Sequence, residues 1–160
     1  MIRPATTVDL PAITAIYNHA VLHGVATFDT EPKTLAERGL WFNEHNESYP
    51  ILVMIEQEQV VGWASLSKWS AKAAYDLSAE ISIYFLPENQ GKGYGNQLLP
   101  AILEAGKSGG LHTIIARITE GNEVSIHLHK KFGFESVGTL KEVGNKFNRF
   151  IDVHLMQLML

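Results

Sequence analysis

A glycine-rich segment near the middle of the chain has the composition of a phosphate-binding loop. It follows a predicted strand, precedes a predicted helix, and consists of Gln90, Gly91, Lys92, Gly93, Tyr94, Gly95 and Asn96. Glycines leave backbone N–H groups accessible to an anion, and both a helix N-terminus and a lysine favour negative charge. The segment therefore predicts that the N–H groups of residues 91–96 bind a pyrophosphate. The alternative is an ordinary glycine-rich turn between a strand and a helix.

Two common nucleotide-binding motifs do not fit this segment. A Walker A motif requires Ser or Thr after Gly-Lys, whereas Gly93 follows Lys92. A dinucleotide fingerprint requires glycine where Asn96 stands, together with a βαβ unit at the start of the chain. The pattern therefore argues against the P-loop and Rossmann classes.

A carboxylate stands in the apolar strand just before the glycine segment. Glu80 lies at the start of the run Ala79–Leu86, among Ile, Tyr and Phe side chains. A carboxylate in an apolar strand is costly unless it is paired or functional. Such a group can also take up a proton from a reacting group that lies beside it. Glu80 is therefore a candidate general base, and a strand residue that faces solvent is the alternative.

Three polar residues share one face of a predicted helix over residues 122–132. They are Asn122, Ser125 and His129, spaced by three and four residues. A histidine there can donate a proton near neutral pH, and a histidine packed in a cavity wall is the alternative. Asn122 can also be no more than a helix cap. The seven histidines show no metal-ligand spacing, so no metal site is predicted.

Length and composition limit the class of protein. A chain of 160 residues predicts a single domain over residues 1–160. A net charge of −4 argues against a general nucleic-acid binder, and no apolar run is long enough to span a membrane. The chain has no cysteine, which excludes disulfides and thiolate chemistry. No signal peptide is visible at its start, so the cytoplasm is the expected compartment.

Hydrophobic periodicity predicts an alternation of strands and helices. Helices are expected over residues 7–23, 34–47, 95–108 and 122–132, and strands over 2–5, 51–56, 60–66, 79–86, 113–118, 134–143 and 147–158. This order mixes hairpins with crossovers. It predicts an α+β fold (mixed α/β), with a central, mixed but mostly antiparallel sheet flanked by helices.

The glycine segment and the polar helix resemble the two cofactor signatures of the GNAT superfamily of acetyl-CoA-dependent N-acetyltransferases. Residues 90–95 are similar to its Gln/Arg-x-x-Gly-x-Gly/Ala signature. The run Asn122-x-x-Ser125-x-x-Leu128-His129-x-x-x-Gly133-Phe134 is similar to its second cofactor-side segment. The predicted element order is also that of the GNAT fold.

Segments over nearly the whole chain resemble one branch more closely, the phosphinothricin N-acetyltransferases. That branch includes enzymes acting on methionine sulfone and methionine sulfoximine. The segments are 16–19, 28–32, Tyr49-Pro50, Trp69-x-x-Lys72-x-Ala74-Tyr75 and Ala79-Glu80-x-Ser82-x-Tyr84. The branch commonly has Arg where this chain has Lys72, and Lys offers a point charge in place of a bidentate clamp.

The resemblance implies a role for each candidate residue. Acetyl-CoA is expected along the strand at Ile83, Tyr84 and Phe85, on the glycine segment, and against Asn122, Ser125 and Lys131. Glu80 is the expected base, and His129 stands where many members have a tyrosine that protonates the CoA thiolate. The expected substrate-binding residues are Phe28, Lys72, Ala73, Ala74 and Tyr75.

The resemblance implies acetyl transfer to the amine of a small amino-acid-like substrate, by direct attack in a ternary complex, in a homodimer. Two alternatives remain open at this point. One is a GNAT enzyme that acts on another amine, such as a polyamine or a protein N-terminus. The other is an acyl-CoA-binding domain without catalysis, in which the base would be expected to be lost.

Overall fold

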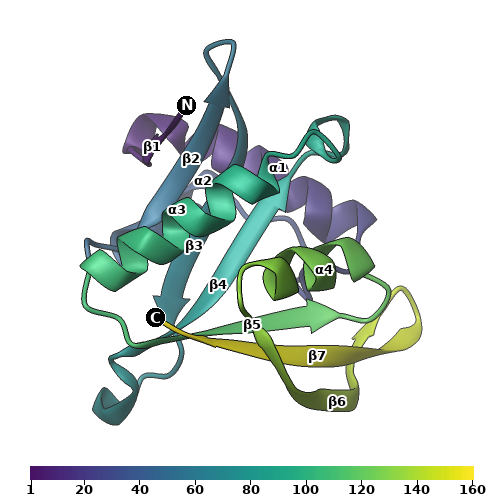
Figure 1. Cartoon of the computed structure of the whole chain (residues 1–160). Helices are drawn as coiled ribbons and strands as arrows, with labels where there is room; N and C mark the ends of the chain where they lie inside the picture. Colours follow the sequence, from purple (N-terminus) through teal and green to yellow (C-terminus); the bar gives the residue numbers. More distant parts are fainter.

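The computed structural model describes all 160 residues, and its centre is a sheet of seven strands (Figure 1). The strand order is β1-β2-β3-β4-β5-β7-β6, and only β4 and β5 run parallel. This mixed, mostly antiparallel sheet with helices on both faces confirms the predicted fold class. The strands are β1 (Ile2–Pro4), β2 (Ile51–Glu56), β3 (Gln59–Lys68), β4 (Ser78–Phe85), β5 (Thr113–Thr119), β6 (Glu135–Lys146) and β7 (Arg149–Met159).

Four α-helices connect these strands: α1 (Leu10–His23), α2 (Leu35–Asn43), α3 (Gly95–Ser108) and α4 (Glu123–Lys131). Several boundaries differ from the sequence prediction. The strands β3 and β6 continue to Lys68 and Lys146, beyond residues 66 and 143, and two helix boundaries also shift. Residues Thr7–Asp9 form a 3-10 turn before α1, and α2 ends at Asn43, short of residue 47. Past α2, the ring of His45 folds back, with Nδ1 bonded to the Trp41 carbonyl and Nε2 to the Ser67 hydroxyl. These contacts replace further helical turns.

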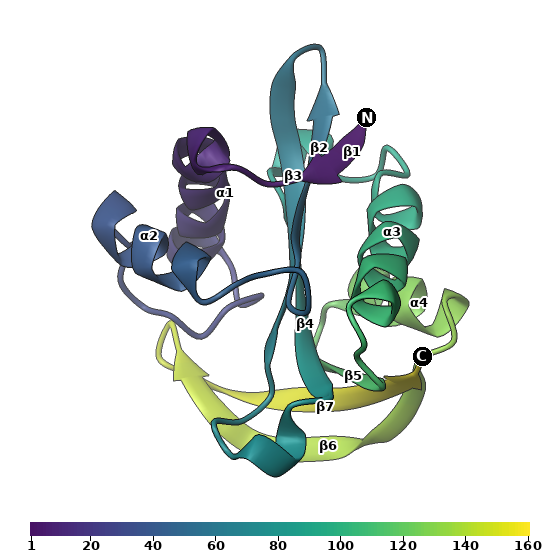
Figure 2. The same ribbon diagram turned by 90° about the vertical axis from the view of Figure 1, so that its left-hand side faces the viewer.

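The helices lie in two layers, α1 and α2 on one face of the sheet and α3 and α4 on the other (Figure 2). The larger apolar core lies between the sheet and α3, and contains Leu98, Leu99 and Ile102. A smaller core on the opposite face surrounds Trp63, which is 1% exposed. Side chains alternate along a strand, so successive residues of β4 face the larger core on one side and the smaller core on the other.

The parallel pair β4–β5 is short, and this feature opens the sheet. Only Ser78–Glu80 pair with Thr113–Ile115. Beyond Glu80 the two strands diverge, β4 toward α1 and β5 toward the β6–β7 hairpin (Figure 1). The backbone of β4 from Ile81 to Phe85 thus keeps its pairing with β3 and loses a partner on its other edge.

No helix of the chain is both long enough and apolar enough to cross a bilayer.

Candidate active site

A cavity of about 710 Å³ lies where β4 and β5 part. Its walls come from both strands, from α1, α2 and α4, and from the loop that carries Phe28 and Asp29. Predicted site residues from distant parts of the sequence meet here: Phe28, Glu80, Ile83, Tyr84, Asn122, Ser125 and His129. The divergence of the two central strands therefore creates the candidate site.

Glu80 is the last residue of β4 that pairs with β5. Its carboxylate is bound by a residue that the sequence analysis did not single out. Arg117 of β5 donates from Nε to Oε1 of Glu80 at 2.7 Å and from Nη2 to Oε2. The Glu80 carboxylate raises the pKa of Arg117, mainly through these hydrogen bonds. The sequence offered one signal for Arg117, a charge in an otherwise apolar and β-branched strand.

His129 of α4 is buried, with 2% of its surface exposed, and contacts the Phe134 ring edge to face. Its Nδ1 lies 2.7 Å from the Ser125 carbonyl oxygen, which can only accept, so Nδ1 carries the proton. Burial lowers the pKa of His129. A lowered pKa and a committed Nδ1 proton do not favour the proton-donor role expected for His129, which stays a prediction. At neutral pH, Nε2 is an unprotonated acceptor without a partner in the protein.

Asn122 caps α4, since its Oδ1 accepts from the Ser125 N–H at 3.3 Å, and both residues line the cavity. Asn122 is therefore a helix cap, and its position at the start of α4 also places its side-chain amide at the cavity wall. Lys131, at the other end of α4, donates to Asn96 Oδ1 at 2.7 Å. This bond ties the end of α4 to the start of α3.

The glycine segment forms an open loop at the N-terminus of α3. Gly91 and Gly93 have φ values of +72° and +79°, which favour glycine. The N–H groups of residues 91–94 make no hydrogen bond within the protein. The prediction for Asn96 is wrong, because its N–H donates to the Gly93 carbonyl at 3.1 Å. A cradle of free N–H groups remains, at residues 91–94.

Several predicted cofactor residues lie beside the cavity and not in its wall. Phe85 packs against the Tyr94 ring, and its carbonyl accepts from Gln90 Nε2 at 3.3 Å. Lys92 reaches Asn89 Oδ1 at 3.4 Å. Gly95 is the first residue of α3, where an added Cβ would lie 2.8 Å from Leu128 Cδ2. That close approach lets α3 and α4 pack together.

Only one of the five predicted substrate-binding residues lines the cavity. Phe28 lines the cavity, and its ring lies against Gly144 of β6, where an added Cβ would be 2.2 Å from Cε2. Lys72, Ala73, Ala74 and Tyr75 do not line it. Ala73–Tyr75 form an exposed 3-10 turn in the β3–β4 connection, and Lys72 is its N-cap. Figure 1 shows this connection at the lower left, beyond the paired ends of β4 and β5, so these four residues lie outside this cavity.

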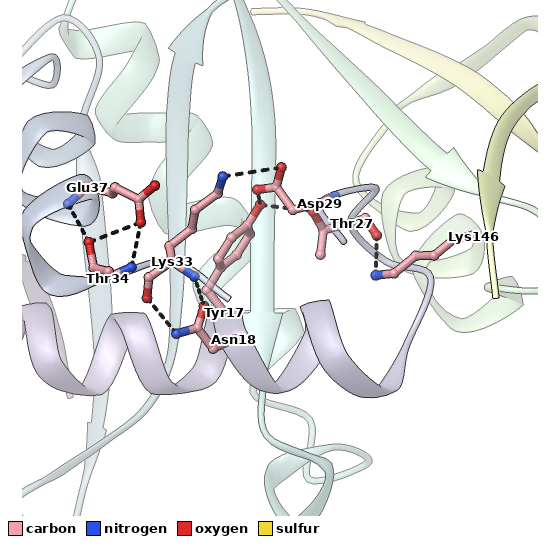
Figure 3. Close-up of polar contacts among 8 residues, drawn as sticks. All are labelled: Tyr17, Asn18, Thr27, Asp29, Lys33, Thr34, Glu37 and Lys146. Carbon is pink, nitrogen blue, oxygen red and sulfur yellow. Dashed lines mark hydrogen bonds and ion pairs between the residues drawn. The ribbon is translucent and has the colours of Figure 1, made fainter. Parts of the chain in front are cut away.

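A polar cluster that was not predicted holds the loop 24–33 on the cavity (Figure 3). The Tyr17 hydroxyl donates to Asp29 Oδ2 and lies 2.9 Å from Thr27 Oγ1. Burial is the main reason that the pKa of Tyr17 is raised to about 12. Lys33 Nζ lies 3.8 Å from Asp29 Oδ1, and Lys146 of β6 donates to the Thr27 carbonyl at 2.9 Å. The cluster therefore joins α1, the loop and the β6–β7 hairpin.

The chain has no group of three His, Asp or Glu side chains placed to hold a metal ion. What the cavity offers is a carboxylate fixed by an arginine, an unprotonated imidazole nitrogen, and an unpaired strand edge that leads to free N–H groups. Such an edge can take an extended amide-containing ligand as an added strand.

Comparison with known proteins points to acetyl transfer. The sequence pattern of the acetyltransferase (GNAT) domain matches residues 2–155. An L-methionine sulfoximine/L-methionine sulfone acetyltransferase of Pseudomonas aeruginosa is 42% identical over 159 residues, which cover 98% of this chain and 92% of that protein.

Two solved structures share the whole architecture. A phosphinothricin acetyltransferase from Sinorhizobium meliloti in complex with acetyl-CoA has a TM-score of 0.96 at 38% identity, over 100% of this chain and 88% of that one. A ribosomal-protein-alanine N-acetyltransferase from Brucella melitensis also has a TM-score of 0.96, at 40% identity, over 100% and 99%. The names of these proteins thus agree on the reaction and differ in the amine.

Proposed function

The chain belongs to the GNAT acetyltransferase family, and from that premise we propose that it acetylates the α-amine of a small amino-acid-like substrate of the phosphinothricin, methionine sulfone or methionine sulfoximine type. Acetyl transfer from acetyl-CoA is the activity of the family. The observation that carries the proposal is the cavity at the parting of β4 and β5, with Glu80 fixed at its apex.

The residues present fit acetyl-CoA, the donor of the acetyl group. The unpaired edge of β4 at residues 81–85 suits the amides of a pantetheine arm. The free N–H groups of residues 91–94, at the N-terminus of α3, suit a pyrophosphate. When bound, acetyl-CoA supplies a thioester whose carbonyl carbon an amine can attack. Asn122 and Ser125 of α4 are proposed to border that arm.

Glu80 is proposed as the proton acceptor of the reaction. An amine must be neutral to attack, so a proton has to leave it before or during attack. A Glu80 oxygen takes this proton, directly or through one water. Arg117 orients the carboxylate, because its two donors fix both oxygens, and so acts as a positioning residue.

His129 is proposed to accept a hydrogen bond in the cavity through Nε2. Its Nδ1 proton is committed to the Ser125 carbonyl, and burial keeps the ring neutral. Nε2 can return a proton to a departing thiolate only after it has first taken one up. The role expected from sequence, a ready proton donor, is therefore replaced by that of an acceptor.

The identity of the amine substrate is the part of the proposal for which alternatives exist. The relative from Brucella is named for a protein substrate, and a polyamine is a further alternative. A small substrate is favoured because the cavity, of about 710 Å³, is bounded by α1, α2 and the Phe28 loop on one side and by α4 on the other. A binding domain without catalysis is disfavoured by the fixed carboxylate at Glu80.

We further propose that residues 1–160 act as one N-acetyltransferase domain in a homodimer. β6 is the edge strand of the sheet, spans 12 residues and is exposed over most of its length. Long exposed edge strands are normally covered. Apolar side chains gather on this hairpin, including Val137, Phe147 and Phe150, each at least 60% exposed. A second copy of the chain would cover them.

The proposed setting is the cytoplasm, where acetyl-CoA is available, and the proposed role is detoxification. Acetylation removes the charge and nucleophilicity of the α-amine, which a toxic amino-acid analogue needs in order to mimic an amino acid. The test is release of CoA thiol with L-phosphinothricin, L-methionine sulfone and L-methionine sulfoximine as acceptors. Spermidine and an alanine-ended peptide represent the two rival amine classes.

A further inference from the structure

The loop between α1 and α2 is part of the cavity wall, yet no secondary structure holds its backbone. Residues 26–29 and Lys33 line the cavity. Residues 25–33 make no hydrogen bond between backbone groups. A segment without such bonds keeps one conformation only where other groups bind it. The shape of this wall therefore depends on side chains that come from other elements.

The two ends of the loop are held by α1 and β4. Asn18 of α1 binds both backbone groups of Lys33, with each hydrogen bond at 2.8 Å (Figure 3). Tyr84 of β4 donates to the Ala26 carbonyl at 3.3 Å. The Tyr17 hydroxyl adds contacts to side chains of the loop. None of these bonds reaches the backbone of residues 27 and 28, in the middle of the loop.

The middle of the loop is held by β6. Lys146 donates from Nζ to the Thr27 carbonyl at 2.9 Å, and the Phe28 ring lies against Gly144. Gly144 and Lys146 are two residues apart, so their side-chain positions are on the same face of the strand. They are also the only two buried residues of β6. These two positions of the strand therefore receive two consecutive residues of the loop.

Lys146 is the one buried lysine of the chain, at 4% exposed. It forms no ion pair. Burial lowers the pKa of Lys146, and the negative charge of Asp29 acts in the opposite direction. An apolar side chain of similar length would avoid the cost of burying an ammonium group. What the ammonium adds is a charged donor, which binds the Thr27 carbonyl more strongly than a neutral donor would.

The loop and the expected acetyl-CoA site lie on different sides of the sheet. The loop connects α1 and α2 on one face, whereas α3 and α4 lie on the other (Figure 2). Acetyl-CoA is proposed to bind at the N-terminus of α3 and against α4. A change in the loop should therefore affect the acceptor, the molecule that brings the amine, and leave acetyl-CoA binding intact.

We propose that Lys146 is a positioning residue for the acceptor: through the Thr27 carbonyl it keeps Phe28 in the cavity wall, and so sets how tightly the acceptor binds. This inference rests on the proposed function, which supplies the acceptor. Lys146 does not line the cavity and acts only through the loop. Without its hydrogen bond, the acceptor has to order the loop when it binds, and its affinity falls by that cost.

The position of the loop is measured by the rate at which chymotrypsin cuts after Phe28. Fragment masses identify the cut, and cleavage after Tyr75, which is 44% exposed in the β3–β4 connection, serves as the internal reference. Proteases cut segments that open locally. Relative to Tyr75, cleavage after Phe28 is expected to be at least fivefold faster in Lys146→Met than in the native protein.

Acceptor binding is measured by the fluorescence of Trp41 and Trp63, which line the cavity, so the readout does not require acetyl transfer. L-methionine sulfone is titrated with CoA present. Lys146→Met is expected to bind the amino acid at least fivefold more weakly than the native protein. Its affinity for CoA, titrated alone, is expected to stay within twofold of the native value.

Three further variants separate position from general damage. Lys146→Arg keeps a charged donor and is expected to recover most of the affinity. Lys146→Gln is one atom too short to reach the carbonyl and is expected to behave like Lys146→Met, which covers the case in which Lys146→Met does not fold. Lys107→Met, at an exposed position near the end of α3, is expected to match the native protein.

Native affinity for the amino acid in Lys146→Met and Lys146→Gln would overturn the assignment, even if cleavage after Phe28 became faster. So would an equal loss of amino-acid and CoA binding, which indicates general structural damage. Failure of the proposed function has a different signature: a native protein that binds the amino acid more tightly than Lys146→Met does, but transfers no acetyl group to it.

Discussion

Arg117 of β5 holds both carboxylate oxygens of Glu80 of β4, across the last paired position before the two strands diverge. The pair connects the architecture of the sheet with the chemistry proposed for it. A carboxylate held at two points cannot rotate freely, so one orientation of its lone pairs faces the cavity. Glu80 keeps 21% of its side-chain surface exposed, which leaves room for a substrate or a water.

The first prediction concerns proton transfer. Glu80→Gln should lower kcat by about 10²- to 10⁴-fold, the usual contribution of a general base, and should leave the KM for acetyl-CoA unchanged. Arg117→Gln should lower kcat by a smaller factor, because Glu80 is then present but less well oriented. Steady-state kinetics measures both. Equal activity of Glu80→Gln and native enzyme at neutral pH would remove Glu80 from the mechanism.

The second prediction concerns the glycine loop. Gly93→Ala should raise the KM for acetyl-CoA, because φ = +79° strains any other residue and would distort the N–H cradle. The KM for the amine should not change. Gly110→Ala is a matched control, since Gly110 also has positive φ (+93°) and open space around its Cα but lies outside the loop. Equal effects of both variants on the KM for acetyl-CoA would argue against a role for the loop.

The third prediction concerns the wall formed by Phe28. Gly144→Ala should displace this ring, which an added Cβ would meet at 2.2 Å, and should raise the KM for the amine several-fold. Overpacking of this kind typically costs about 1–3 kcal/mol of stability. Gly138→Ala, on the same strand with nothing within 4 Å, should leave both the KM values and the melting temperature unchanged. A normal amine KM in Gly144→Ala would mean that Phe28 does not border the substrate.

The fourth prediction concerns pH and stability. Burial lowers the pKa values of His45 and His129 below the ordinary value of 6.5, so the unfolded chain binds more protons than the folded one in this range. The stability from these neutral rings is full above about pH 6.5 and is lost as the pH falls through the lowered pKa values.

Melting temperatures between pH 7.5 and 5 measure this effect. The lowered carboxyl pKa values of Asp9 and Asp152 act below pH 4 and stay outside this window. His129→Gln should flatten the pH dependence, and His112→Gln, at an exposed position, should not. An unchanged slope in His129→Gln would contradict a buried neutral ring.

The fifth prediction concerns the assembly. Sedimentation of the native protein should give twice the mass of one chain. Replacement of Phe150, which is 61% exposed on β7, by Glu should shift the protein toward the monomer. Leu22→Glu, at an exposed apolar position of α1, is the control and should leave the assembly unchanged. A native protein that sediments as a monomer at micromolar concentration would rule out the proposed homodimer.

The fold could be predicted almost completely from the sequence because its signals are local. Periodicity and breakers such as Pro50, Pro87 and Gly109 mark the elements, and the errors fall at the ends of helices and strands. Thr34 and Glu37 form a capping box that starts α2, at the residue where the helix was expected to begin. The end of α2 depends on the ring of His45, which contacts residues on either side of it in sequence, including Ser67 on β3. A local pattern contains no information on such a contact.

The site could be predicted only in part, and the physical reason is the same. The residues that line the cavity from one strand or one helix, such as Glu80 and His129, follow from motifs and resemblance. Arg117 acts through a partner that is distant in sequence, Glu80 on a neighbouring strand. The four residues at 72–75 do not line this cavity, so their expected substrate contact stays a prediction that rests on the motif alone.

The most direct test of the account is release of CoA thiol from acetyl-CoA with each candidate acceptor. The chain contains no cysteine, so the protein adds no background to a thiol-reactive dye. The account predicts turnover with L-methionine sulfone, L-methionine sulfoximine or L-phosphinothricin, and little or none with spermidine or an alanine-ended peptide. Turnover restricted to spermidine or to the peptide would contradict the proposed substrate class, and the absence of turnover with every acceptor would contradict the proposed function.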